Sequence, residues 1–258
     1  MKINIIYLIL LRLYARIRAI NFFFLKICSM FIIRFFPVHD WYKISLFITY
    51  FTRFKLSLLL IKKIPLAFIR ARDMDTLMGF ITRSGKAFSI PFRLKTQASI
   101  EHVSGIVLCT VHLPLVKVAI RGYMEEINKI DTAIVGAKPK HGLMAVWGMT
   151  EKIPAIERSS HVLLKAKRIL MNKGTIVLMI DNARTGIYSP NILHLCGKIQ
   201  SRLVFFIAEL THEGIVECNY LNPPFPYCES EFAISENLVF LKQKYDQILK
   251  KYREQTVF

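Results

Sequence analysis

The runs Gly105-Ile-Val-Leu-Cys-Thr-Val111 and Thr175-Ile-Val-Leu-Met-Ile180 decide the fold of this chain. Both are free of charge and rich in β-branched residues, which is typical of strands covered on both faces of a sheet. We predict further strands at 86–92, 132–137, 153–156 and 215–221. Helices are predicted at 73–84, from His112 to about Asn128, and at 161–172, 203–211 and 235–253. Strands that alternate with helices of this length predict an α/β fold, a mostly parallel sheet flanked by helices.

The residues before this α/β region differ from it in composition. Positions 1 to about 70 predict two or three helices, broken at Pro37 and Pro65. Residues 1–100 hold 17 Lys and Arg against three acidic residues, a net charge of +14, whereas residues 101–258 hold 19 against 15, a net charge of +4. We therefore expect a basic, apolar helical region over 1–70 that anchors the protein to a membrane, and an α/β domain over 71–258.

The composition of the whole chain excludes several classes of protein. Apolar residues make up 53% of the 258, which is too many for a disordered chain. The five cysteines are an odd number without a Cys-x-x-Cys pair, so they indicate buried thiols in a reducing compartment and not a disulfide scaffold. No cluster of His, Cys and Asp has the spacing of metal ligands, and we predict neither a metal nor a cofactor.

The net charge of +18 suits an anionic partner, either a nucleic acid or a membrane. Nucleic-acid-binding proteins place their Lys and Arg on polar surfaces. Here single cations interrupt apolar sequence, as in Asn21-Phe-Phe-Phe-Leu-Lys-Ile-Cys-Ser-Met-Phe-Ile-Ile-Arg-Phe-Phe-Pro37. This pattern indicates helices that lie in a lipid interface while their cations reach anionic headgroups. We therefore predict an anionic membrane surface as a partner, and no nucleic acid.

We expect this attachment to be peripheral. The longest charge-free runs near the N-terminus, Ile3–Leu11 and Ile44–Thr52, have nine residues each, whereas a helix that crosses a bilayer needs about 20. A short signal-anchor that runs through Leu13 stays open as an alternative, as does a buried helical hairpin whose Arg residues face solvent. A cleaved signal peptide is not expected, because no small-x-small site follows the first apolar run.

His112 and Asp181 each directly follow one of the two deciding strands. The carboxyl ends of parallel strands form the ligand-binding edge of an open α/β sheet, so we expect both side chains there. A histidine at a helix N-terminus can be held neutral and act as a general base near pH 7. The alternatives are a structural histidine at 112 and a turn or N-cap aspartate at 181.

The block Gly105-Ile-Val-Leu-Cys-Thr-Val-His-Leu-Pro-Leu-Val-Lys117 resembles the core block of the bacterial lipid A biosynthesis acyltransferases, the lauroyl and myristoyl transferases of the lysophospholipid acyltransferase superfamily. In that family an apolar strand leads into His, four residues, and then Glu or Asp. Ala166–Asp181 is similar to the family's helix, Lys-Gly turn, apolar strand and Asp. Leu195-Cys-Gly197 is similar to its Phe-Phe-Gly, and Phe205–Leu210 to one of its helices. The resemblance covers about residues 100–225.

The resemblance implies an O-acyltransferase. Such an enzyme moves a fatty acyl chain from an acyl thioester, on acyl-carrier protein or coenzyme A, to a hydroxyl of a membrane lipid or glycolipid acceptor. His112 would be the base and Asp181 a site carboxylate, on the cytoplasmic face of the bacterial inner membrane. Arg158 resembles a family arginine and, like Arg184, could hold an anionic part of the substrate, with a solvated arginine as the alternative. The acyl chain is expected in an apolar groove, and the residues proposed to line it are Leu113, Leu115 and Met144, which are equally expected in the core.

Lys117 departs from the family pattern, because it stands where the acidic residue is expected. A lysine can neither orient His112 nor stabilise its imidazolium form. Three hypotheses follow. Lys117 binds a substrate phosphate while Asp181 or Glu125 supplies the carboxylate; or the protein is a catalytically degenerate relative that binds lipid at the membrane; or Lys117 faces solvent and His112 works alone.

Overall fold

A computed structural model describes residues 5–56, 66–96, 104–127, 132–136, 143–157, 159, 161–181 and 187–254 of the chain. Its helices are α1 (Ile5–Phe35), α2 (Trp41–Leu56), α3 (Leu66–Thr82), α4 (Val116–Gly122), α5 (Val162–Met171), α6 (Asn191–Lys198) and α7 (Glu231–Glu254), with a short 3₁₀ turn η1 (Val38–Asp40) and a π-helical turn η2 (Tyr123–Ile127). Its strands are β1 (Phe92–Thr96), β2 (Ile106–Thr110), β3 (Thr132–Gly136), β4 (Leu143–Ala145), β5 (Lys152–Glu157), β6 (Thr175–Met179), β7 (Arg202–Leu210) and β8 (Val216–Leu221).

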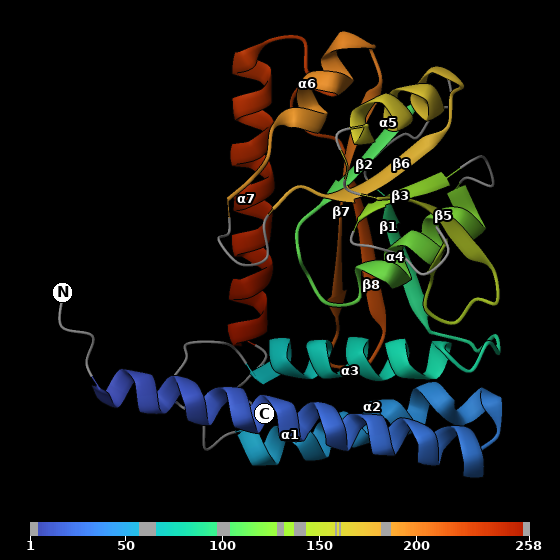
Figure 1. The fold of residues 1–258 in the computed structure, drawn as a ribbon, viewed down its shortest axis with the longest axis vertical. Coiled ribbons are helices and arrows are strands. Elements are labelled where there is room, and N and C mark those ends of the chain that lie inside the picture. Colours follow the sequence, from blue (N-terminus) through green and yellow to red (C-terminus); the bar gives the residue numbers. More distant parts are fainter. Residues whose placement is uncertain are drawn as a thin grey trace.

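The described strands form one eight-stranded sheet in the order β1-β8-β7-β2-β6-β3-β5-β4 (Figure 1). Pairing is parallel except for the β7–β8 hairpin and the short edge strand β4. The sheet confirms the predicted α/β fold with a mostly parallel sheet. Strand β2 lies at its centre, and all five of its residues are buried, as its apolar sequence requires.

Helices cover both faces of this sheet. On one face Phe205 of β7 stacks on Phe240 of α7. On the other face the hydroxyl of Tyr220 in β8 donates a hydrogen bond to the carbonyl of Ala119 in α4. Phe206, the next residue of β7, stacks on Tyr220. Phe205 and Phe206 thus point to opposite faces of the sheet, as successive residues of a strand do.

The first three helices form a separate layer beside the sheet, in which α3 lies between the sheet and the pair α1 and α2 (Figure 1). Leu25 and Ile32 on the inner side of α1 are fully buried. The hydroxyl of Tyr42 in α2 donates to the carbonyl of Gly214 in the β7–β8 turn at 2.6 Å, which ties this layer to the sheet. Residue 70, where we place the boundary between the two regions, lies within α3. No helix in the described part of the chain has a stretch long and apolar enough to cross a bilayer.

The prediction of a helix at 203–211 is wrong, because these residues belong to β7. β7 lies between β2 and β8 and is covered on both faces, so almost every residue in it is buried. An apolar run of this length has no polar face, and periodicity therefore cannot distinguish a buried strand from a buried helix. The likeness of Phe205–Leu210 to a family helix fails for the same residues.

Smaller differences concern the ends of elements. The strand expected at 86–92 begins only at Phe92, and the helix expected at 73–84 begins at Leu66. The helix expected directly after His112 begins at Val116, after a turn in which Leu115 has a positive φ of 63°. α6 and β4 are additional elements that the sequence patterns did not predict.

Candidate active site

Two neighbouring parallel strands bring His112 and Asp181 together. Strands β2 and β6 pair in register, with Thr110 opposite Met179. The amide of Ile180 donates to the carbonyl of Thr110 at 3.0 Å, which continues the pairing by one residue. His112 and Asp181 follow at equivalent positions beyond the carboxyl ends of the two strands. The structure thus has both residues at the predicted edge of the sheet.

The Asp181 carboxylate holds His112 by two hydrogen bonds to the same oxygen. Oδ1 accepts from the backbone N–H of His112 at 2.9 Å and lies 2.8 Å from the ring Nδ1. Because an ionised carboxylate only accepts, we assign the ring proton to Nδ1, which leaves the lone pair on Nε2. Nε2 has no partner within the described part of the chain, and 35% of the His112 side chain is exposed. The ring is thus oriented as a base that is open to a ligand.

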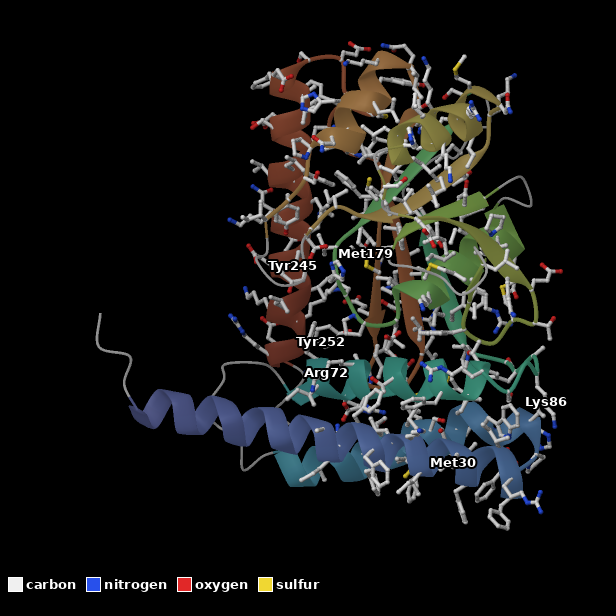
Figure 2. The ribbon with its side chains drawn as sticks, in the orientation of Figure 1. Met30, Arg72, Lys86, Met179, Tyr245 and Tyr252 are labelled. Atoms are coloured by element: carbon white, nitrogen blue, oxygen red, sulfur yellow. The ribbon has the colours of Figure 1, made fainter. Side chains whose placement is uncertain are left out.

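Two tyrosines that the sequence patterns did not single out lie near this pair. Tyr188 forms an antiparallel bridge with Asp181, and Tyr245 projects from the side of α7 that faces the sheet (Figure 2). Burial, with the Asp181 charge next, raises the pKa of both phenols. Both phenols therefore stay neutral in the field of the carboxylate. Tyr188 follows Asp181 closely in sequence and could have been found, but the docking of α7 leaves no local signal for Tyr245.

An apolar cavity of about 470 Å³ opens beside Asp181. Its lining comes from β3, α5, β6 and α6, and it includes Val135, Val162, Leu163, Leu178, Ile187 and Ile192. The polar groups in its wall include Ser159, Asn191 and Asp181 itself. Small-molecule sites are mostly apolar with a small number of placed polar groups, and this cavity has that character. This cavity is not lined by the residues predicted for the groove, since Leu113 and Leu115 are core residues with 5% and 0% exposure.

The Lys117 ammonium lies 3.8 Å from the centre of the ring of Trp147, which follows β4. Burial lowers the pKa of Lys117, and the nearby Asp75 carboxylate opposes this. The half-buried side chain is therefore engaged with Trp147 and Asp75, which does not fit the hypothesis of a lysine that simply faces solvent. Glu125, proposed as an alternative carboxylate, instead binds Arg121 at 2.8 Å. Of the two acidic residues proposed for His112, Asp181 is the one in contact with it.

Arg158 and Arg184, the other predicted substrate-binding residues, lie outside the described residues. In the described part no three His, Cys, Asp or Glu residues gather in a way that could hold a metal ion.

No family model matches the chain, and no curated protein is significantly similar to it.

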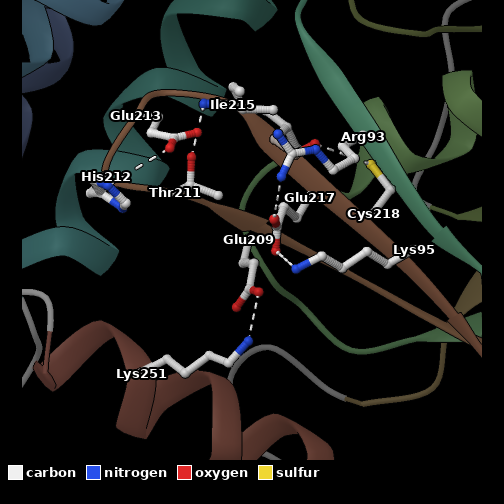
Figure 3. Close-up of polar contacts among 11 residues, drawn as sticks. Arg93, Lys95, Glu209, Thr211, His212, Glu213, Ile215, Glu217, Cys218 and Lys251 are labelled. Carbon is white, nitrogen blue, oxygen red and sulfur yellow. Dashed lines mark hydrogen bonds and ion pairs between the residues drawn. The ribbon is translucent and has the colours of Figure 1, made fainter.

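A second polar group lies where β1, β8, β7 and α7 meet (Figure 3). Glu209 and Glu217 are directly opposite each other in the β7–β8 hairpin, and both are buried. Like charges in this arrangement repel. Lys251 binds Glu209 at 2.8 Å and Lys95 binds Glu217 at 2.6 Å, so each carboxylate has its own cation. Burial would raise the pKa of Glu217, but Lys95, together with Glu209 and Lys251, lowers it overall.

Proposed function

We propose that this protein is an O-acyltransferase that moves a fatty acyl chain from an acyl thioester to a hydroxyl of a membrane lipid or glycolipid. The observation that carries the proposal is the contact between His112 and Asp181, in which Nδ1 is held and Nε2 meets no partner among the described residues. The same orienting role belongs to the aspartate of a Ser-His-Asp triad. Here it compensates for Lys117, so the missing family carboxylate does not argue against catalysis.

The proposed reaction needs one base and no covalent enzyme intermediate. Nε2 of His112 takes the proton of the acceptor hydroxyl, and the hydroxyl oxygen attacks the thioester carbonyl carbon. The carbon–sulfur bond then breaks, and the proton passes from His112 to the departing thiolate. Asp181 accepts the Nδ1–H hydrogen bond throughout and stabilises the positive imidazolium between the two proton transfers.

The apolar cavity beside Asp181 is the proposed place of the acyl chain. Its lining residues would hold the hydrocarbon, and Asp181, which belongs to the lining and also contacts His112, would connect the chain with the reacting thioester. The donor thioester would belong to acyl-carrier protein or coenzyme A, and Arg158 and Arg184 remain proposed anion-binding residues, whereas the ammonium of Lys117 is taken up by the Trp147 ring. The resemblance of residues 100–225 to lipid A acyltransferases favours a lipid or glycolipid acceptor.

The outer face of α1 and α2 is the proposed membrane-binding surface. Large apolar side chains recur along α1 at helical spacing and are exposed at Ile20, Phe23, Ile27, Met30, Phe31 and Phe35. Met30 points away from the sheet (Figure 2). Lys26, Arg34 and Lys43 are exposed on the same two helices and would reach anionic headgroups. An exposed apolar surface of this size marks an interaction site, and we place it on the cytoplasmic face of the bacterial inner membrane.

Lipid mass spectrometry of cells that express the native chain or His112→Ala tests the proposal. A matched control is His194→Ala, because His194 also is 35% exposed and also contacts a carboxylate, that of Glu231. We expect an acylated lipid that appears with the native chain and the control but not with His112→Ala, at equal protein levels in the membrane. Unchanged lipid in the native host would refute the proposed catalysis.

Lys117 favours one alternative, a catalytically degenerate protein on the same fold that binds lipid at the membrane. Such a protein would carry lipid regardless of His112. Native mass spectrometry of the purified chain distinguishes the two functions. The alternative predicts equal amounts of the same bound lipid in the native chain and His112→Ala, together with unchanged cellular lipids.

A further inference from the structure

The segment between His112 and α4 holds a strained backbone. Leu115, at the N-terminus of α4, adopts the left-handed conformation with φ 63° and ψ 8° although it has a Cβ. Such residues persist only where their surroundings hold them in place. Leu115 is fully buried, and its carbonyl accepts the amide of Val118 at 2.8 Å to begin the helix. The groups that hold Leu115 in this conformation therefore also determine where residues 112–114, which include His112, lie.

Asp75, on the side of α3 that meets this loop, binds Leu115 directly. Its Oδ1 accepts the backbone N–H of Leu115 at 3.1 Å and the indole N–H of Trp147 at 2.7 Å. One oxygen thus joins three separate parts of the chain: α3, the loop after β2, and the segment after β4. The contact connects the helical layer with the edge of the sheet that carries His112.

Trp147 holds the Asp75 carboxylate by its indole N–H and is itself held on both sides. The Trp147 ring is packed on Gly79, one turn further along α3, where a Cβ would come within 3.1 Å of the ring. Lys117 lies on that ring and beside Asp75. Burial raises the pKa of Asp75, while the hydrogen bonds from Trp147 and Leu115 and the charge of Lys117 oppose this rise. The lysine that stands in place of the expected acidic residue thus packs on the ring that binds Asp75, and its charge favours the ionised form of that carboxyl.

We propose that Asp75 is a positioning residue, which holds the His112–Leu115 loop so that the His112 ring and amide both meet Asp181. The role in catalysis rests on the proposed function of His112, but the positioning itself can be measured without any substrate. Loss of the Leu115 contact would let the strained turn relax and would move His112 relative to Asp181. The expected result is a ring that samples both tautomers.

The test is NMR of ¹⁵N-histidine-labelled full chain in detergent micelles, with the His112 signals identified by their loss in His112→Gln. In the native chain we expect one protonated Nδ1 signal and one lone-pair Nε2 signal for His112, at a pH where the ring is neutral. In Asp75→Ala the two signals should move toward each other as the tautomers mix. Hydrogen exchange of the His112 amide should accelerate about tenfold or more, because its hydrogen bond to Asp181 opens.

Two further variants separate geometry from charge. Asp75→Asn keeps an oxygen that can accept from both the Leu115 amide and the Trp147 indole, and it removes the charge. The His112 signals of this variant should therefore be the same as those of the native chain. Asp75→Glu keeps the charge but shifts the oxygens by one methylene, so it should resemble Asp75→Ala. These two variants decide the matter even where Asp75→Ala fails to fold. Native His112 signals in Asp75→Glu together with altered His112 signals in Asp75→Asn would refute positioning by hydrogen bonds.

A destabilised control guards against a general loosening of the fold. Tyr42→Phe removes one buried hydrogen bond, that to Gly214, at the junction of α2 with the β7–β8 turn. It should lower stability without changing the His112 signals. The proposal is overturned where Tyr42→Phe disturbs His112 as much as Asp75→Ala does, or where Asp75→Ala leaves His112 unchanged. Absence of acyltransferase activity would refute the proposed function and leave this result intact.

Discussion

Replacing Phe23 and Phe35 by serine should release the protein from anionic membranes. Their exposed fractions are 62% and 66%, and both belong to the outer stripe of α1. A phenylalanine has a surface of roughly 200 Å², and about two thirds of it is exposed at either position. At about 25 cal/mol per Å² of inserted surface, either ring contributes about 3 kcal/mol. The two together correspond to a roughly 10⁴-fold change in partitioning as an upper limit. Since rings at an interface stay partly hydrated, we expect a loss of about a hundredfold or more.

Flotation with vesicles that contain anionic lipid, over a range of lipid concentrations, measures this loss. The matched control is Phe232→Ser, because Phe232 is also 66% exposed but lies on α7, away from the α1–α2 layer. The control should bind vesicles like the native chain. Native-like binding of the double variant, or equal loss in the Phe232 control, would refute the assignment of the α1–α2 face as the membrane-binding surface.

Three other substitutions test the site and the fold. Asp181→Asn should lower the rate of acyl transfer to vesicle lipids roughly 10⁴-fold with little change in melting temperature, because the amide N–H₂ favours the wrong tautomer of the histidine ring. Gly105→Ala should destabilise the chain by about 3 kcal/mol or more in denaturant unfolding, because its Cβ would come within 2.7 Å of the backbone Cα of Leu170. Lys95→Met should move acid unfolding, followed by circular dichroism, to higher pH. Folding lowers the pKa of Glu217, so this residue stabilises the fold fully above its unfolded-state pKa of about 4.3. The stabilisation is lost as the pH falls through the lower, folded-state pKa. Removal of Lys95 raises this folded-state pKa, so the loss begins at a higher pH.

Each of these predictions has a result that contradicts it. Full transfer activity in Asp181→Asn would remove the carboxylate from the mechanism. Gly136→Ala is the control for Gly105→Ala, since the nearest atom to its Cβ would lie at an ordinary 3.7 Å, and equal destabilisation would contradict the argument from close approach. Lys152→Met, at another exposed strand lysine, should leave acid unfolding unchanged, and an equal shift would point to net charge alone.

The position of His112 beside Asp181 could be predicted because both follow buried β-branched strands. Parallel strands share their carboxyl edge, so two residues directly after β2 and β6 needed only the strands to be neighbours in order to meet. Sequence alone did not choose between Asp181 and Glu125 as the partner of His112. That choice depends on the Arg121 contact of Glu125, which is a tertiary result.

Other features could not be predicted, for identifiable physical reasons. The sequence of β7 is equally compatible with a buried helix. Because the strand is buried on both faces, it lacks the regularly spaced polar residues that would show a two-residue or a 3.6-residue repeat. Asp75 and Tyr245 approach the site only because α3 and α7 dock with particular faces toward the sheet. Their own sequence neighbourhoods describe helices and carry no information about the distant loop that they meet.

The contact between His112 and Asp181 joins residues 69 positions apart on separate strands. In the family pattern that the chain resembles, the acidic partner lies five residues after the histidine, so one short segment holds both groups. Here the pair can assemble only after β6 has been synthesised and has aligned with β2 in the correct register. During translation, the loop that carries His112 is therefore complete before Asp181 has been synthesised. Because Asp181 supplies the carboxylate from a distant strand, the contact with His112 does not depend on which residue stands at position 117.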